Sequence, residues 1–136
     1  HGHTNNHLAF YISKASAKCN ILFTGDTLFG GGCGRLLEGS PSQMFESLSK
    51  LNSLPENTKI YAGHEYTENN LEWALALEPE NISIIERLKL IQNKLKKGMC
   101  TLPSTLSEER KTNLFLRAEN IEKFTMLRIH KDSWKC

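Results

Sequence analysis

The chain has 136 residues, 39% of them hydrophobic, and a formal net charge of +2 at pH 7. A hydrophobic share of this size supports a packed core and excludes a disordered chain, and the length allows one ordinary domain or two small ones. The small net charge argues against a nucleic-acid-binding protein, which usually carries a clustered basic excess. No stretch is apolar enough to span a membrane and no secretion leader opens the chain, so we expect a cytoplasmic protein without membrane contact.

Two further features bear on the kind of protein. The chain opens at His1 without a start methionine, so we expect it to be part of a longer protein. Its four cysteines form no C-x-x-C pair, which gives no support to a zinc ribbon or a redox dithiol. We therefore expect reduced thiols, as in cytosolic proteins.

The first elements predicted are short strands. Apolar and polar residues alternate early in the chain, and the apolar positions are Leu8, Phe10 and Ile12, a strand pattern. The polar residues 14–20 predict a connecting turn, and the apolar residues 21–23 predict a buried strand that ends near Asp26. Residues 30–34 are mostly glycine, so we expect no regular structure there, because glycine loses much backbone entropy in a helix or strand.

A helix and another strand follow. Ser40, Pro41 and Gln43 form a helix start, with a capping serine, a proline in the first turn and a glutamine that completes a capping box. The apolar residues after it have helical spacing; they are Met44, Phe45, Leu48 and Leu51. Residues 59–62 predict a further short strand, which ends near His64. The order strand, strand, loop, helix, strand is typical of an α/β fold.

After Tyr66 the pattern is helical only. We expect helices at residues 69–77 and 82–97, and another helix start at Thr105. The residues expected on the buried face of the second helix are Ile82, Ile85, Leu88, Ile91 and Leu95. We therefore place a domain boundary at Tyr66, with an α/β part in residues 1–66 and a helical domain in residues 67–136.

Possible metal ligands stand where strands or turns end. They are His3, Asp26 and His64, and imidazole and carboxylate groups suit zinc, iron or manganese. The ends of neighbouring strands meet at one rim of a sheet, so we expect the three side chains to converge there. Each residue alone is a weak signal, since a single histidine is usually structural and an aspartate after a strand is usually a cap. We interpret His7 as a structural histidine that supports the ligands and does not bind metal itself.

Taken in order, the motifs resemble one family. Gly-His-Thr begins at Gly2, Phe-Thr-Gly-Asp-Thr-Leu-Phe at Phe23, Gly-Cys-Gly-Arg at Gly32 and Gly-His-Glu-Tyr-Thr at Gly63. This series resembles the hydroxyacylglutathione hydrolases (glyoxalase II) of the metallo-β-lactamase superfamily, and the resemblance continues through residues 102–106, 108–110, 113–117 and 128–132. It implies an α/β fold: the C-terminal half of a metallo-β-lactamase αββα sandwich, followed by an all-helical domain that binds the glutathione substrate.

The resemblance also implies a site with two divalent metal ions, zinc before iron or manganese. His3 would complete the first metal site, Asp26 would bridge both metals, and His64 would bind the second. The family's first motif, Thr-His-x-His-x-Asp-His, does not occur in this chain. Each metal therefore keeps two of its ligands, and we expect weak metal binding and negligible turnover until the missing N-terminal half of the enzyme is present.

Four residues match the family's glutathione-binding positions: Arg35, Tyr66, Arg128 and Lys131. Glutathione has carboxylates that arginine and lysine bind through charge-assisted hydrogen bonds. Without the resemblance, we would interpret Arg128 and Lys131 as a solvated helix end. Leu37 departs from the family, which often has an aromatic residue there.

The activity implied for the full enzyme is hydrolysis of S-D-lactoylglutathione to D-lactate and glutathione by a metal-bridging hydroxide. One alternative is a glutathione-persulfide dioxygenase with a single iron, which the helical tail and the Gly-Cys-Gly-Arg loop disfavour. A second is a non-enzymatic helical module that binds a glutathione-like anion or a partner protein through Arg35, Arg128 and Lys131.

Overall fold

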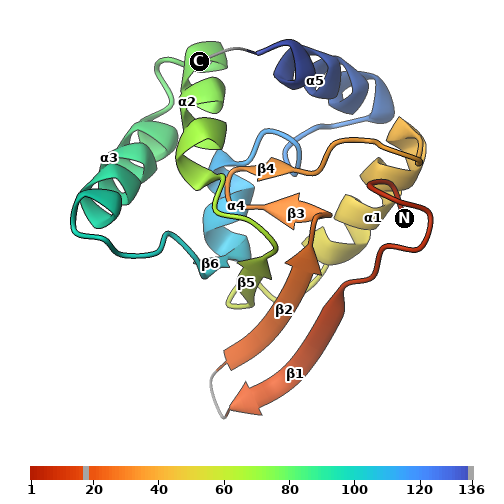
Figure 1. The fold of residues 1–136 in the computed structure, drawn as a ribbon, viewed down its shortest axis with the longest axis horizontal. Helices are drawn as coiled ribbons and strands as arrows, with labels where there is room; N and C mark the ends of the chain where they lie inside the picture. The colour runs from red at the N-terminus through yellow and green to blue at the C-terminus, as the bar shows by residue number, and fades with distance from the viewer. Residues whose placement is uncertain (17–18, 135–136) are drawn as a thin grey trace.

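A small mixed sheet forms one side of the molecule and helices surround its other side (Figure 1). The computed structural model describes residues 1–16 and 19–134, and within these residues the main sheet has four strands in the order β1-β2-β5-β6. These strands are β1 (Phe10–Ser16), β2 (Cys19–Gly25), β5 (Lys59–Ala62) and β6 (Ser104–Thr105). β2 runs antiparallel to β1 and parallel to β5, so the carboxyl ends of β2 and β5 lie at the same edge of the sheet.

A short hairpin follows the second strand. β3 (Leu28–Phe29) pairs antiparallel with β4 (Gly32–Cys33). The expectation of no regular structure in residues 30–34 is therefore wrong for Gly32 and Cys33, because the backbone pairing of this hairpin outweighs the entropy that glycine loses.

The predicted turn at residues 14–20 is also mostly wrong. β1 continues to Ser16 and β2 begins at Cys19, and the remaining residues 17–18 lie outside the described part of the chain. β1 begins at Phe10, so Leu8 precedes it. A strand at the edge of a sheet tolerates polar residues, which is why the polar composition there did not mark a loop.

Five helices lie within the described residues: α1 (Pro41–Asn52), α2 (Thr67–Leu77), α3 (Ile82–Lys96), α4 (Leu106–Thr112) and α5 (Ile121–Ser133). The predicted capping box of α1 is confirmed, since Ser40 Oγ accepts from Gln43 N–H and Gln43 Oε1 accepts from Ser40 N–H. The predicted face of α3 is partly wrong: Ile84, Leu88 and Ile91 are buried, whereas Ile82 is 69% exposed. The buried face also includes a charged residue, Arg87.

The hydrophobic core joins the sheet to the helices. Its members come from both sides of Tyr66, among them Leu22 and Ile60 of the sheet and Trp73 and Phe115 beyond it. The helical residues after Tyr66 thus pack directly on the α/β part, and the domain boundary at Tyr66 stays a prediction. None of the helices in the described ranges is long and apolar enough to cross a bilayer.

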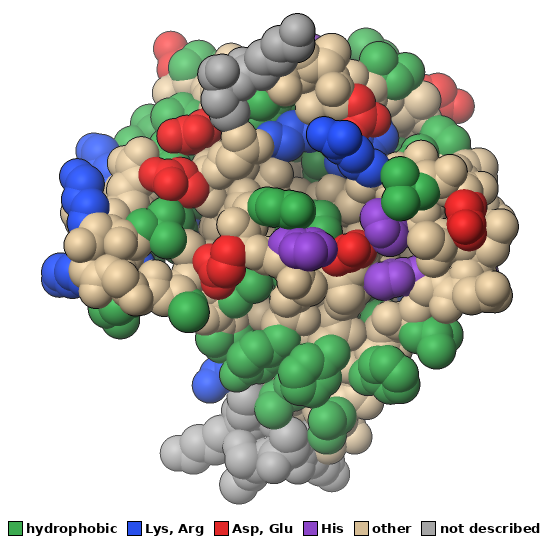
Figure 2. Space-filling view, in the orientation of Figure 1, with side chains coloured by type: hydrophobic (Ala, Val, Ile, Leu, Met, Phe, Trp, Pro, Cys, Tyr) green, Lys and Arg blue, Asp and Glu red, His purple; other side chains and the backbone are tan. Residues whose placement is uncertain are grey.

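The sheet is apolar on both faces, but this chain covers only one of them. Leu22, Thr24 and Ile60 are buried against the core, whereas Phe10, lying opposite Phe23, is 63% exposed. Among the described residues of the β1–β2 hairpin, the exposed large hydrophobic side chains are Phe10, Tyr11, Ile12 and Phe23, and Figure 2 shows hydrophobic side chains gathered over this hairpin. The predicted strand at residues 21–23 is confirmed as part of β2, but its predicted burial holds for Leu22 and not for Phe23, which is 43% exposed.

Candidate active site

Three predicted ligands meet at the edge where β2 and β5 end. Asp26 follows β2 directly and His64 lies two residues after β5, while His3 comes from the segment before β1. His3 Nε2 is 3.4 Å from Asp26 Oδ2, and His64 Nε2 is 3.5 Å from Asp26 Oδ1. The carboxylate therefore lies between the two imidazoles and presents a different oxygen to each. Figure 2 shows histidines around an acidic side chain near the centre of this face.

Hydrogen bonds fix the orientation of this group. His3 Nδ1 lies 2.8 Å from the Arg35 carbonyl oxygen, to which it must donate, so in the neutral ring Nε2 is the nitrogen with the free lone pair, and this nitrogen faces Asp26. His7 Nε2 accepts from the Asp26 backbone N–H at 2.8 Å. The His7 ring also meets the His3 ring edge-on, with centroids 5.5 Å apart. His7 thus lies behind Asp26, and its supporting role stays a prediction.

Two glycines allow the backbone to approach this group closely. A Cβ added at Gly63 would lie 2.6 Å from Asp26 Oδ1, and one at Gly34 would lie 1.9 Å from the Asp26 carbonyl oxygen. Real Cβ atoms do not make contacts this short, so any side chain at either position would displace Asp26. Close contact with Asp26 therefore explains why glycine occupies position 63 in the Gly-His-Glu-Tyr motif and position 34 in the Gly-Cys-Gly motif.

The donor set suits divalent cations but is small. Neutral imidazole nitrogen and carboxylate oxygen are ordinary ligands of zinc, iron and manganese. Among residues 1–16 and 19–134, no three or more His, Cys, Asp or Glu side chains are grouped so that they could hold a metal ion together. The pairs His3–Asp26 and His64–Asp26 would each give a cation two protein donors, one fewer than a catalytic zinc usually has.

The predicted substrate residues lie around a cavity of about 550 Å³ that opens beside this group. It is lined by His3, Asp26, Phe29, Cys33, Gly34, Arg35, Leu37, His64, Tyr66, Asn69, Asn70, Arg128, Lys131 and Trp134. The Tyr66 ring stacks on His64, with centroids 5.0 Å apart, and meets Phe29 edge-on. Lys131 Nζ donates to Asn69 Oδ1 and lies over the Trp73 ring. All four predicted substrate residues are thus brought to one cavity wall or rim.

Arg128 differs from the others because it is buried. Its guanidinium donates to the Cys33 carbonyl oxygen and, through Nε and Nη2, to Asp132 Oδ1. It also lies over the Phe115 ring. The alternative interpretation of Arg128 as a solvated helix end is therefore wrong. Arg35 is exposed, and its Nε lies 3.8 Å from the same Asp132 oxygen.

Sequence reasoning missed Asp132, the acid that neutralises Arg128. Asp132 lies in the segment 128–132 that carries the resemblance, and its spacing from Arg128 was a signal of the pairing, since residues four apart on a helix are neighbours. It also missed the setting of Cys33, whose thiol lies 3.6 Å from Arg128 Nη1. Burial raises the pKa of Cys33 to about 12, and the nearby Arg128 charge offsets only part of that effect.

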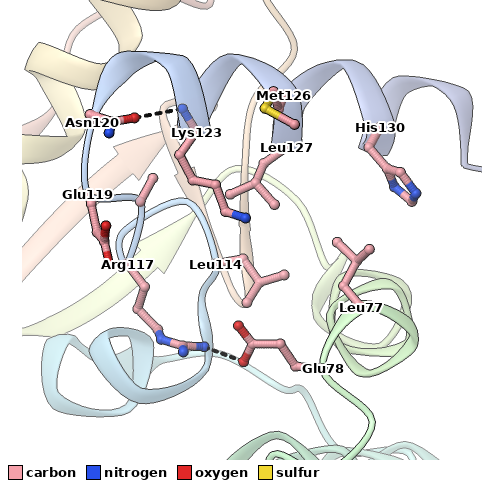
Figure 3. A pocket seen from close by; sticks show the side chains of 11 residues that line it. Leu77, Glu78, Leu114, Arg117, Glu119, Asn120, Lys123, Met126, Leu127 and His130 are labelled. Atoms are coloured by element: carbon pink, nitrogen blue, oxygen red, sulfur yellow. Dashed lines mark hydrogen bonds and ion pairs between the residues drawn. The ribbon is translucent and has the colours of Figure 1, made fainter.

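A second cavity, of about 560 Å³, lies along α5 and the loop before it (Figure 3). Arg117 crosses its floor to form an ion pair with Glu78, at 2.7 Å. Lys123 and His130 also line it, but His130 Nδ1 accepts from Trp73 Nε1–H. The described residues that line this cavity include no histidine paired with a carboxylate, so we place the candidate chemistry in the first cavity.

The family model and the curated relatives to which this chain is similar carry the same family name. A family model described as "Hydroxyacylglutathione hydrolase C-terminus" matches residues 65–134. The hydroxyacylglutathione hydrolase of Prochlorococcus marinus strain NATL1A is 84% identical over 136 residues, which are all of this chain and 54% of that protein. The hydroxyacylglutathione hydrolase of Synechococcus sp. strain CC9605 is 47% identical, with 98% of this chain and 54% of that protein covered. The chain thus spans about half the length of the curated relatives it matches.

Two solved structures share the fold. ETHE1 from Myxococcus xanthus aligns with a TM-score of 0.60 at 24% identity, covering 94% of this chain and 41% of its own. A metallo-β-lactamase from Staphylococcus aureus subsp. aureus COL aligns with a TM-score of 0.58 at 23% identity, covering 99% and 33%. The expected partial metallo-β-lactamase sandwich with a helical C-terminal part is confirmed.

Proposed function

Because the chain belongs to the hydroxyacylglutathione hydrolase family, we propose that it is the C-terminal half of an enzyme that hydrolyses S-D-lactoylglutathione to D-lactate and glutathione. The observation that carries the proposal is the placement of Asp26 between two imidazoles, at the mouth of a cavity with basic residues on its wall. This arrangement joins a site for hydrolytic chemistry to a site for an anionic substrate.

The proposal includes two divalent cations, held in part by His3, Asp26 and His64. Zinc is the first choice, and iron and manganese suit the same donors. When bound, such cations supply Lewis acidity toward the thioester carbonyl and acidify water. The chain's own contribution is to hold the acceptors: His7 and Gly63 keep Asp26 in place, and the Arg35 carbonyl sets the tautomer of His3.

The glutathione part of the substrate would be bound by Arg35, Tyr66 and Lys131. Arginine and lysine pair with its carboxylates, and fixing the substrate in one orientation contributes to the rate. Arg128 would act differently from the family expectation. Its guanidinium already donates to Asp132 and to the Cys33 carbonyl oxygen. Arg128 would therefore hold β4 and α5 together beside the cavity and would not bind a carboxylate of the substrate.

The remaining ligands would come from the other half of the enzyme. The curated relatives are about twice as long as the chain's match to them, and each cation has two donors here. The same missing half would cover the apolar face formed by Phe10, Ile12 and Phe23, which the described part of the chain leaves exposed. We therefore expect the chain alone to bind metal weakly and to show negligible turnover.

A hybrid protein tests the proposal. This chain would be joined to the N-terminal half of the NATL1A relative, and D-lactate release from S-D-lactoylglutathione would be measured. We expect the hybrid to be active and the chain alone to be inactive. Asp26→Asn should reduce kcat/KM beyond the roughly 10–100-fold loss typical of supporting residues, because it removes a shared ligand. Glu119→Gln, which removes an acid outside the first cavity, is the matched control.

The alternatives predict other results. A persulfide dioxygenase would release sulfite and consume oxygen with glutathione persulfide, and the hybrid would then fail with the thioester. A non-enzymatic module would bind glutathione without metal and without the second half, which calorimetric titration of the chain alone would detect. Brisk hydrolysis by the chain alone would overturn the proposed need for the other half.

A further inference from the structure

A buried charged cluster lies against the β3–β4 turn and takes no part in the chemistry described above. Its members are Arg87 on α3, Glu109 on α4 and Asn113 at the end of α4. The Glu109 side chain is completely buried, and one of its oxygens accepts from Arg87 Nη2 at 2.5 Å. Burial opposes the charge on Arg87, but the carboxylates of Glu109 and Glu108 outweigh it and raise the Arg87 pKa above its ordinary value.

The other Glu109 oxygen binds the glycine-rich hairpin. Oε2 accepts from the Gly31 backbone N–H at 2.8 Å and from Asn113 Nδ2 at 3.1 Å. Asn113 Nδ2 also donates to the carbonyl oxygens of Gly32 and Phe29, at 3.0 and 3.4 Å. Glu109 and Asn113 therefore satisfy backbone groups on both sides of the β3–β4 turn, across 78 residues of sequence.

The hairpin leads directly to the candidate active site. Two residues after Gly32 the backbone of Gly34 lies against the Asp26 carbonyl, and the next carbonyl, that of Arg35, accepts from His3 Nδ1. Gly34 N–H also donates to the Thr27 carbonyl oxygen. A displacement of the hairpin would therefore shift both the Arg35 side chain and the group that orients His3.

The cluster is poorly explained as a device for stability. Replacing a buried ion pair by apolar residues is often neutral or stabilising, so the pair is weak evidence for a stability role. Arg87 Nε is buried and, among the described residues, has no hydrogen-bond partner. Gly31 has a φ of +67°, and glycine populates positive and negative φ about equally, so its own preference does not select this conformation. The hydrogen bond from Gly31 N–H to the Glu109 carboxylate favours it.

We propose that Glu109 is a positioning residue: its carboxylate, held by Arg87, fixes the glycine-rich hairpin so that the Arg35 carbonyl keeps His3 Nε2 aimed at Asp26. The helical part of the chain would thereby set the geometry of a ligand at the sheet edge. The proposal rests on the proposed function only for its activity assay, because the position of the hairpin is measured separately.

The test compares variants of the hybrid protein. Glu109→Gln removes the charge, so one amide oxygen can no longer serve both Arg87 and Gly31. Glu109→Asp keeps the charge for Arg87 but shortens the reach to Gly31, and it serves as the second variant if Glu109→Gln does not fold. Arg110→Gln is the matched control, since Arg110 on the same helix binds Asn52 and Leu54 and does not touch the hairpin.

Three quantities would be measured at a temperature where circular dichroism shows every variant folded. We expect both Glu109 variants to lose about 10-fold in zinc affinity and in kcat, as supporting residues of metal sites do. We expect faster hydrogen exchange in the peptide spanning residues 28–35, with unchanged exchange in α1. Arg110→Gln should lower thermal stability without changing zinc affinity, kcat or the exchange of residues 28–35.

The outcomes separate the two proposals. Faster exchange of residues 28–35 with reduced zinc affinity, in a hybrid that hydrolyses no thioester, would support the positioning role and sink the proposed function. Glu109 variants that match Arg110→Gln in exchange, zinc affinity and kcat would show that Glu109 is only structural. An unchanged kcat with a raised KM alone would also overturn the proposal, because His3 would then be unaffected.

Discussion

Cys33 shows how burial decides the chemistry of a single residue. The structure places its thiol beside Arg128, a neighbour that would favour a reactive thiolate, yet burial raises its pKa to about 12. We predict that a thiol reagent at about pH 8 modifies the exposed Cys100 and leaves Cys33 unmodified in the folded hybrid protein. Peptide mass spectrometry would locate the label, with urea-unfolded protein as the control in which both react. Native labelling of Cys33 at the rate of Cys100 would contradict the burial argument.

Glu78 provides a test of pH dependence at the same scale. Its partial burial raises its pKa, but hydrogen bonds from Arg117 and Asn81 outweigh this and hold the pKa below the ordinary value of 4.5. A lowered folded-state pKa contributes stability that is fully present above pH 4.5 and is lost as the pH falls through the folded-state value. We predict that Glu78→Gln flattens the loss of unfolding free energy in acid, measured by urea unfolding at a series of pH values. An acid dependence identical to that of the unsubstituted hybrid would show that the ion pair contributes nothing.

At the scale of elements, α3 distinguishes buried from exposed isoleucines. Ile84 is fully buried, whereas Ile82 is 69% exposed although it is only two residues away. We predict that Ile84→Ala lowers the unfolding free energy by about 2–5 kcal/mol, while Ile82→Ala changes it by about 0.5 kcal/mol or less. Urea unfolding of both variants would measure the difference. Equal effects would contradict the burial of Ile84 and the exposure of Ile82.

The same helix shows where prediction from sequence ended. Apolar spacing located α3 and two of its buried residues, Leu88 and Ile91, but it left out Arg87, because such a pattern considers apolar side chains only. Arg87 is buried through contacts with Glu109 and Thr112, which lie more than 20 positions away in sequence and follow no local pattern. Helix starts were easier to predict, since the Ser40 capping box depends on neighbouring residues only.

In the candidate site, too, some features could be predicted from the sequence and others depend on contacts between distant residues. The convergence of His3, Asp26 and His64 could be expected because strand ends share a rim, and the motifs fixed their order. Glu109 lies within the segments that carry the resemblance, but the sequence assigned it no role, since a glutamate in the first turn of a helix is ordinarily an exposed, dipole-stabilising residue. Its role depends on a hydrogen bond to Gly31, which only the three-dimensional structure shows.

At the scale of the whole molecule, one apolar face of the sheet remains exposed in this chain. β1 is an edge strand, and the side chains of Phe10, Ile12 and Phe23 lie on its solvent side or next to it. A long apolar edge of this kind favours association between chains. We have proposed that the N-terminal half covers this apolar face. If so, one substitution on the face should have opposite effects in the isolated chain and in the hybrid protein.

Ile12→Lys should act in opposite directions in the isolated chain and in the hybrid protein. In the isolated chain a lysine would shield the exposed face, so light scattering should show less association. In the hybrid the same lysine would be buried under the N-terminal half without a partner, so the melting temperature should fall. Ile129→Lys is the matched control, because Ile129 is a 65% exposed isoleucine on α5, away from the sheet. It should leave both properties unchanged, and equal behaviour of the two lysine variants would refute the proposed cover.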